Sequence, residues 1–422
     1  MKHPFQKLLL GFSILFLMFS FSSCGTWSEN SASDSNTSYL PLDDSEYPYA
    51  GLPRLVIETE NFRQINDKET KVPAHLQFYD ENKPSSQILD LTIKGRGNSS
   101  FVMTKFGYKI KLTEKNSMLG MPKDKEWDLI SNFRDKSMLQ NYITYQLAGI
   151  LGDEYYPKCK FIELYLNRQY QGIFLLVEHV KVSKKRVNIS KNDSSFLFEK
   201  TSATSTDGTM FTSSLGYIFK FCQPKEPSEH SQSLLENHIN DFEQFLQSKS
   251  IYNLDSIAKW IDIDDFVRFH WIQDFTKNVD GHRRSIFITW EKTDNAEGPI
   301  AMGPVWDFDL GYGNSGDVKR GPEGWLIRNY GWDRFLFKNN DYETRVREYW
   351  KKNRSAFVAT LDSIDSMSQK LAEASQNEFK KWPVLENDES FPFFRKFSNY
   401  QEAVDTLKSW IEQRIQWIDE NI

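Results

Sequence analysis

The sequence is poor in cysteine, has no internal repeat and has no long block of charge of one sign. Three of its 422 residues are cysteines, and their spacing contains no zinc-binding pattern. The 52 basic and 58 acidic residues give a net charge of −6 and are spread along the chain. Nucleic-acid-binding proteins usually concentrate basic residues, so this distribution argues against DNA or RNA as the main partner.

An apolar run near the N-terminus is too short to span a bilayer as a stable helix. It covers residues 8–21, follows Lys2 and Lys7, and ends at "FSSCG". This pattern predicts a lipoprotein signal peptide over residues 1–23, with Cys24 as the lipidated first residue of the mature protein. The alternative is an ordinary secretory signal with an incidental cysteine. We therefore expect an extracytoplasmic protein, in the periplasm or at the cell surface, anchored to the membrane through the N-terminal lipid.

Residues 24–50 are predicted to form a flexible tether. Most of this segment is rich in Ser, Asn and Asp and poor in apolar residues, so it has little to bury. Beyond it remain Cys159 and Cys222. In an oxidising compartment they pair or stay as two unlinked thiols, and their spacing leaves both alternatives open.

The rest of the chain predicts an α+β protein with two lobes. Its 39% hydrophobic and 15% aromatic residues are enough for large buried cores. Strand patterns dominate residues 51–180 and helical patterns residues 181–422, so we expect a β-rich N-lobe, a mainly helical C-lobe and a cleft between them. The strands are expected at 52–60, 74–80, 88–97, 106–114, 159–167, 170–182, 196–200, 216–221, 285–291 and 300–308. The helices are expected at 136–151 (with Asp135 as N-cap), 231–248, 262–277, 341–378 and 399–421.

The first candidate site is the stretch "KGRGNSS" at residues 94–100. Gly95 and Gly97 stand between two predicted strands, where glycine lets backbone amides approach a phosphate closely. The alternative is a β-turn in which Arg96 and Asn98 have capping roles.

The second candidate site is a pair of lysines on the predicted strand at 106–114. Alternation places Lys109 and Lys111 on one face and Tyr108, Ile110 and Leu112 on the other. Two lysines on one face are able to reach phosphate oxygens as point charges. An exposed, solvated sheet face is an equally good interpretation.

The third candidate site combines Asp280 with Asp307 and Asp309. Asp280 follows a predicted helix, whereas Asp307 and Asp309 follow an apolar run typical of a buried strand. A hairpin between them would bring the two places together. One acid would then orient an attacking hydroxyl and the other would hold Mg²⁺ or Mn²⁺. The alternative is a structural pair, with Asp280 as a helix cap and Asp309 as a surface acid.

Several stretches in a fixed order carry a resemblance to a known family. They are "IKGRGNSS" with "YKIKL", "WDLISNFRDKSMLQNYITYQLAGILG", "FIELYLNRQYQGIFLLVEHVKV", "FTKNVDGHRRS" and "MGPVWDFDLGYGN", within about residues 52–315. In this order they resemble the CotH kinase family, the spore-coat-protein-H group of atypical kinases. The C-terminal "WIEQRIQWID" is also similar to the end of that family.

The resemblance implies a kinase-like fold with ATP between the lobes. Asp280 would be the catalytic-loop acid and Asp307 a ligand of Mg²⁺ or Mn²⁺, with Asp309 a second metal ligand or a neighbour. Lys109, in preference to Lys111, would contact the phosphates.

The resemblance also implies roles for two other parts of the chain. Arg96 and Asn98 would contact phosphates from the loop that contains Gly95 and Gly97. Backbone groups near Glu178, in "LLVEHV", would meet adenine.

The sequence departs from a conventional protein kinase at three places. Ser285 stands where such kinases have a metal-binding Asn, and Asp309 replaces the glycine of their Asp-Phe-Gly triplet. The predicted helix at 136–151 has no acid before Asp153, so the usual partner of the strand lysine is missing or lies elsewhere.

The leading hypothesis is an ATP-dependent phosphotransferase at the cell envelope that acts on protein Ser or Thr hydroxyls. One alternative is a surface-tethered binding or assembly module that has the kinase fold without turnover. Another is a kinase that phosphorylates a glycan hydroxyl with the same two aspartates.

Overall fold

The computed structural model describes residues 41–202, 208–293, 296–315, 321–386 and 395–422. The predicted signal peptide, Cys24 and most of the predicted tether lie outside these ranges. Cys159 and Cys222 are free thiols, so of the two alternatives for this pair the structure has unlinked cysteines. Over the described ranges, no helix is both long and apolar enough to cross a membrane.

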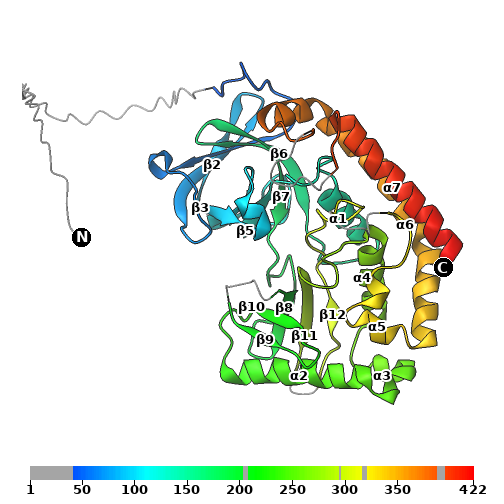
Figure 1. Ribbon diagram of the computed structural model, residues 1–422. Helices are drawn as coiled ribbons and strands as arrows, with labels where there is room; N and C mark the ends of the chain where they lie inside the picture. Colours follow the sequence, from blue (N-terminus) through cyan, green and yellow to red (C-terminus); the bar gives the residue numbers. More distant parts are fainter. Residues whose placement is uncertain (1–40, 203–207, 294–295, 316–320, 387–394) are drawn as a thin grey trace, which may run out of the picture. The chain divides into compact units, whose positions relative to one another are not determined.

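The N-terminal part of the described chain, up to Glu178, folds into a closed β-barrel (Figure 1). Its strands follow the order β1-β2-β3-β4-β5-β7-β6, and a parallel pairing of β1 with β6 closes it. The buried side chains of β4 include Tyr108, Ile110 and Leu112, as the alternation predicts. The strands are β1 (Arg54–Thr59), β2 (Val72–Asp80), β3 (Lys83–Arg96), β4 (Gly107–Asn116), β5 (Asp124–Ile130), β6 (Cys159–Leu166) and β7 (Gln169–Glu178).

The C-terminal part, after Glu178, combines helices with another sheet. That sheet has the strand order β12-β11-β8-β10-β9. The helix α2 packs on it, and the ring of His238 on α2 stacks on that of Trp290 on β11, with 3.7 Å between the ring centroids. Its strands are β8 (Ser195–Thr201), β9 (Met210–Thr212), β10 (Ile218–Gln223), β11 (Ile286–Glu291) and β12 (Ala301–Met302). Its helices are α2 (Glu229–Gln247), α3 (Leu254–Ile257), α4 (Ile263–Thr276), α5 (Asp333–Leu336), α6 (Asn340–Lys381) and α7 (Tyr400–Asn421), whereas α1 (Gln140–Ile150) lies between β5 and β6 in the sequence.

The helix α6 contacts both the barrel and the C-terminal part. Near its start, Trp271 of α4 donates a hydrogen bond from its indole nitrogen to the carbonyl of Val346, over 2.8 Å. At its other end, Trp382 donates from its indole nitrogen to the carbonyl of Gln171 on β7, over 3.0 Å. Figure 1 shows α7 lying alongside α6. The amphipathic patterns at 341–378 and 399–421 therefore predicted these two helices well.

The expected α+β class with a β-rich N-terminal region and a helical C-terminal part is confirmed. The β-rich region is a closed barrel, and the C-terminal part carries a sheet as well as helices. The lobe boundary at residue 180 stays a prediction, although the last barrel strand ends at Glu178.

Several expected elements were wrong in extent: the strand expected at 170–182 ends at Glu178, the strand expected from residue 88 begins at Lys83, and two more differ near the candidate site. The strand expected at 300–308 is only Ala301–Met302, because Gly303 has φ = +106° and Pro304 has no N–H to continue the pairing. The helix expected from residue 136 begins at Gln140. Asp135 precedes the helix but still caps its first turn, because its Oδ2 accepts a hydrogen bond from the backbone amide of Gln140 over 2.7 Å.

Candidate functional site

A cleft of about 510 Å³ brings the three candidate sites together. The glycine loop, the strand lysine and the paired aspartates all contribute to its walls. Lys111 is exposed and, like Glu178, does not line it. The predicted residues that line the cleft are Gly95, Arg96, Gly97, Asn98, Lys109, Asp280, Asp307 and Asp309.

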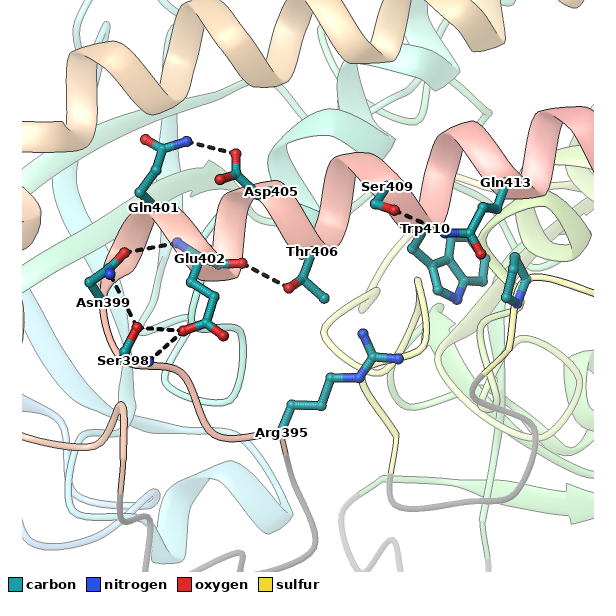
Figure 2. A pocket seen from close by; sticks show the side chains of 11 residues that line it. Arg395, Ser398, Asn399, Gln401, Glu402, Asp405, Thr406, Ser409, Trp410 and Gln413 are labelled. Atoms are coloured by element: carbon teal, nitrogen blue, oxygen red, sulfur yellow. Dashed lines mark hydrogen bonds between the residues drawn. The ribbon is translucent and has the colours of Figure 1, made fainter.

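A different hollow lies along α7 and is lined mainly by that helix and the residues before it (Figure 2). Its side chains bond to one another, for example Gln401 to Asp405 over 2.8 Å and the hydroxyl of Ser398 to Glu402 over 2.6 Å. Among the described residues, none lines both this hollow and the cleft. We therefore place the chemistry in the cleft.

The glycine loop between β3 and β4 is shaped by close packing. A Cβ on Gly95 would lie 2.2 Å from the ring of Phe101, and Gly97 has φ = +106°. The Gly95 amide donates to the carbonyl of Asp67 over 3.0 Å, so it is not directed at a ligand. These glycines thus allow a tight turn over the cleft, which side chains at both positions would disturb.

Lys109 is held at the cleft by two partners. Its Nζ lies 2.8 Å from Oε2 of Glu126 and 2.7 Å from Nε2 of His179. Burial lowers the pKa of Lys109, and Asp128 and Glu126 oppose that shift. The acid that the predicted helix at 136–151 lacks is therefore supplied by β5.

Asp128 connects this lysine to the glycine loop. Its Oδ1 lies 3.3 Å from Nε of Arg96, and its Oδ2 lies 2.9 Å from Nδ1 of His179. Burial alone would raise the pKa of Asp128, but Arg96 and His179 hold it well below its usual range. Asp128 is therefore an ionised carboxylate that fixes two cleft-lining side chains.

Asp280 follows α4 in a turn stabilised by Asn278, whose Oδ1 accepts a hydrogen bond from the Asp280 amide over 3.2 Å. Arg283 Nη2 and Arg284 Nε lie 2.9 Å and 3.1 Å from the Asp280 Oδ1. Among the residues that the structure describes, none donates a hydrogen bond to Oδ2. One carboxylate oxygen therefore remains for an acceptor group in the cleft.

Asp307 lies beside this turn, as a hairpin between the two sites predicts. Its Oδ2 accepts a hydrogen bond from the Ser285 hydroxyl over 3.0 Å, and its carbonyl accepts one from the Asn278 amide group over 3.1 Å. The next amide, of Phe308, donates to Oδ1 of Asn141 on α1 over 2.8 Å. Asp307 itself has φ = +67°. Contacts from two directions thus hold this backbone in an uncommon conformation.

The negative charges of Asp280, Asp307 and Asp309 repel one another in the cleft. Burial and the charge of Asp280 raise the pKa of Asp307, while burial and Asp307 raise the pKa of Asp309 to about 8. Arg134 is the cation next to Asp309, with Nη1 4.0 Å from Oδ2. Partly buried like charges of this kind are stabilised when a cation binds between them.

The oxygen donors here fit Mg²⁺ or Mn²⁺. Within the described ranges, no three His, Cys, Asp or Glu side chains are arranged to hold a metal by themselves. Mg²⁺ does not need such a cage, because it is often bound by one or two carboxylates together with water and substrate phosphates. Asp307 and Asp309 would supply those carboxylates, and the hydroxyl of Ser285 lies next to Asp307.

The base of the turn that contains Asp280 is anchored by a buried ion pair that the sequence did not reveal. Asp274, near the end of α4, pairs with Arg414 of α7 at 2.8 Å. Asp274 also accepts a hydrogen bond from the Ile327 amide over 2.9 Å. Glu126, Asp128 and His179 were missed as well. The only signal for them lies in the quoted stretches "WDLIS" and "LLVEHV", which contain or border these residues.

A comparison with protein families gives a match over most of the chain. The family described as CotH kinase protein matches residues 93–418, which include every cleft residue of the three candidate sites. No curated protein matches the chain.

Proposed function

The chain belongs to the CotH kinase family, and from this premise we propose that it is an ATP-dependent phosphotransferase acting on Ser or Thr hydroxyls of proteins. One observation carries the proposal. A single cleft contains a tight glycine loop, a lysine paired with Glu126, and the two acids Asp280 and Asp307. This combination suits phosphoryl transfer, which depends on positioning and on neutralising negative charge.

In the proposed reaction, Lys109 and Arg96 contact the phosphates of ATP from the barrel. Asp307 and Asp309 would hold Mg²⁺ or Mn²⁺, which would supply positive charge next to the transferred group. Asp280 accepts the proton of the acceptor hydroxyl through Oδ2, while Arg283 and Arg284 fix Oδ1. The hydroxyl oxygen then forms its bond to the γ-phosphorus as the bond to ADP breaks.

The nucleotide base would lie where β7 leaves the barrel. Glu178 is unsuited to meet adenine, since its amide donates to the carbonyl of Lys158 over 3.0 Å and its Oε2 accepts from the Lys158 amide over 3.1 Å. His179 and Val180 line the cleft directly after it. We therefore move the proposed adenine contact from Glu178 to the backbone of Val180.

We also propose an envelope location. The signal-like segment ending at Cys24 supports a lipid anchor, and with it a membrane partner for the mature chain. Acceptors would then be proteins of the envelope or cell surface.

A thermal-shift titration of the mature chain tests the nucleotide site. With ATP and Mg²⁺ or Mn²⁺ at about a hundred times Kd, binding should stabilise the fold by about 2.7 kcal/mol. Asp307→Ala should lose the metal-dependent part of this shift, and Asp241→Ala, on an exposed position of α2, should keep it. No shift with any nucleotide and metal would overturn the proposal in favour of the binding-module alternative.

Transfer of labelled γ-phosphate tests turnover and identifies the acceptor class. Asp280→Ala should lower transfer to protein Ser or Thr by at least about a hundredfold while leaving the thermal shift intact. Unchanged turnover would refute the role of Asp280. Labelled glycan in place of labelled protein would make the chain a glycan kinase.

A further inference from the structure

His179 joins two charged groups of the cleft. It directly follows β7, and its Nδ1 lies 2.9 Å from Oδ2 of Asp128. Its Nε2 lies 2.7 Å from Nζ of Lys109. The imidazole therefore stands between an ionised acid and the lysine assigned to the phosphates, and the proposed reaction gives it no role.

The two contacts determine the protonation state of the ring. An ionised Asp128 only accepts hydrogen bonds, so the hydrogen must be on Nδ1. The ammonium of Lys109 only donates, so Nε2 must offer its lone pair. A doubly protonated ring would place two donors 2.7 Å apart. The geometry thus requires a neutral imidazole with one defined tautomer.

We propose that His179 is a positioning residue that orients the ammonium of Lys109 towards the phosphates of ATP. This role rests on the proposed function. Of the three hydrogens of Lys109, one is directed at His179 and one at Glu126, 2.8 Å away, which leaves one for a phosphate. A neutral ring orients the ammonium without cancelling its charge, whereas a second carboxylate would compete with the phosphate for it.

The arrangement makes nucleotide affinity depend on pH. Burial lowers the pKa of His179, and Asp128 opposes that shift, so protonation occurs below the ordinary value of about 6.5. The imidazolium would then repel the ammonium, and affinity should fall as pH falls through that range. The charged groups facing His179 are Asp128, Glu126, Lys109 and Arg186, whose Nη1 donates to the His179 carbonyl over 2.8 Å.

Binding of Mg²⁺-ATP to matched variants of the mature chain tests this role. At pH 7.5, His179→Leu should weaken binding about tenfold, the loss expected for about 1.4 kcal/mol. His179→Gln keeps a side-chain acceptor and should lose less, and both variants should lose less affinity than the unmodified chain as pH falls below about 6.5. The control is His75→Leu, because His75 also pairs with an acid, Asp90 at 2.6 Å, but on the exposed surface of β2.

Nitrogen-15 NMR of the unmodified chain gives a readout that does not depend on how the variants fold. We expect the Nδ1–H tautomer of His179 at pH 7.5, and observing the Nε2–H tautomer or a charged ring would overturn the proposal. If the unmodified chain binds nucleotide and His179→Leu binds equally well, this role alone is overturned. If the unmodified chain binds no nucleotide, the proposed function fails, and this role with it.

Discussion

At the scale of single residues, Asp309 occupies a position that opposes folding of the metal-free chain. Burial and the neighbouring Asp307 raise its pKa to about 8, whereas an unfolded chain has a value of about 3.9. The folded state therefore holds a proton that the unfolded state releases, and stability declines as pH rises from about 4 to about 8. Residues in functional sites often lower the stability of the folded state in this way.

Asp309→Asn should therefore stabilise the metal-free chain. We expect a gain of roughly 2 kcal/mol in the free energy of unfolding at pH 8.5 and almost none near pH 4. Urea unfolding with a chelator at both pH values measures it, with Asp241→Asn as an exposed control. Equal stability of Asp309→Asn and the unmodified chain at pH 8.5 would show that the carboxylates do not crowd each other.

Glu126 should have the opposite pH dependence. Burial alone would raise its pKa, but Lys109 and Lys181 hold it well below its ordinary value of about 4.3. A lowered pKa gives stability that is present above about pH 4.3 and is lost as pH falls below it. Glu126→Gln should cost roughly 1–3 kcal/mol at pH 7 and flatten the acid side of the stability profile. Glu114→Gln, on an exposed position of β4, should change neither quantity.

Residue-level prediction succeeded where a local pattern sufficed. Alternation along β4 placed Lys109 on the correct face of the strand. It placed Lys111 on the same face, so it predicted phosphate contact for both lysines. The distinction depends on the register with β5, in which Lys109 lies opposite Asp128 and Lys111 opposite Glu126. Register follows from pairing between strands, so one strand's sequence could not show which lysine lines the cleft.

At the scale of elements, the end of α6 is fixed to the barrel by a buried ion pair. Lys105 donates from Nζ to Oε1 of Glu378 and to the carbonyl of Ile173, both over 2.6 Å. Oε2 of Glu378 accepts the Ile173 amide, also over 2.6 Å. Lys105 lies between the glycine loop and β4, so α6 stabilises the base of the loop from behind the cleft.

Removing this carboxylate should destabilise the fold strongly. Glu378→Ala leaves the charge of Lys105 buried and the Ile173 amide without its partner, which should cost about 3–5 kcal/mol. Glu373→Ala, on an exposed position of the same helix, should change the free energy of unfolding by less than about 0.5 kcal/mol. Denaturant unfolding of both variants measures the difference. A loss below about 1 kcal/mol for Glu378→Ala would contradict the anchoring role.

Elements with a strong local period were predictable, and their assembly was not. The amphipathic pattern predicted α2 within two residues at its start, and Asp262 caps α4 as an acid before a helix should. The strands β8, β10 and β11 were each expected, but their union in one sheet was not, since β11 is far along the chain from β8. Long-range pairing of this kind leaves no local signal.

At the scale of the whole molecule, attachment to a membrane should depend on one thiol. Cys24→Ala should stop lipid incorporation and move the protein from the membrane fraction to the soluble fraction. Metabolic labelling with a radioactive fatty acid, followed by fractionation, measures both effects. Cys222→Ala is the matched control and should remain labelled and membrane-bound. Continued labelling of Cys24→Ala would favour the ordinary secretory signal.

The grouping of the candidate residues was predictable from the order of the motifs more than from any one of them, and their roles stay a prediction. The glycine loop, Lys109 and the aspartates each had a reasonable structural alternative, and the cleft unites them. The groups that orient them, such as Glu126 and His179, come from other strands, and only the closed barrel brings these to the same wall.

The helix α6 has a mechanical consequence for the cleft. It is 42 residues long, about 63 Å, and is bonded to α4 near one end and to β7 at the other. A rotation of the barrel relative to the helical part would have to bend α6 or break the buried ion pair between Glu378 and Lys105. We therefore expect the width of the cleft to stay nearly constant. Ligands would enter and leave through movements of the glycine loop and of side chains at the entrance.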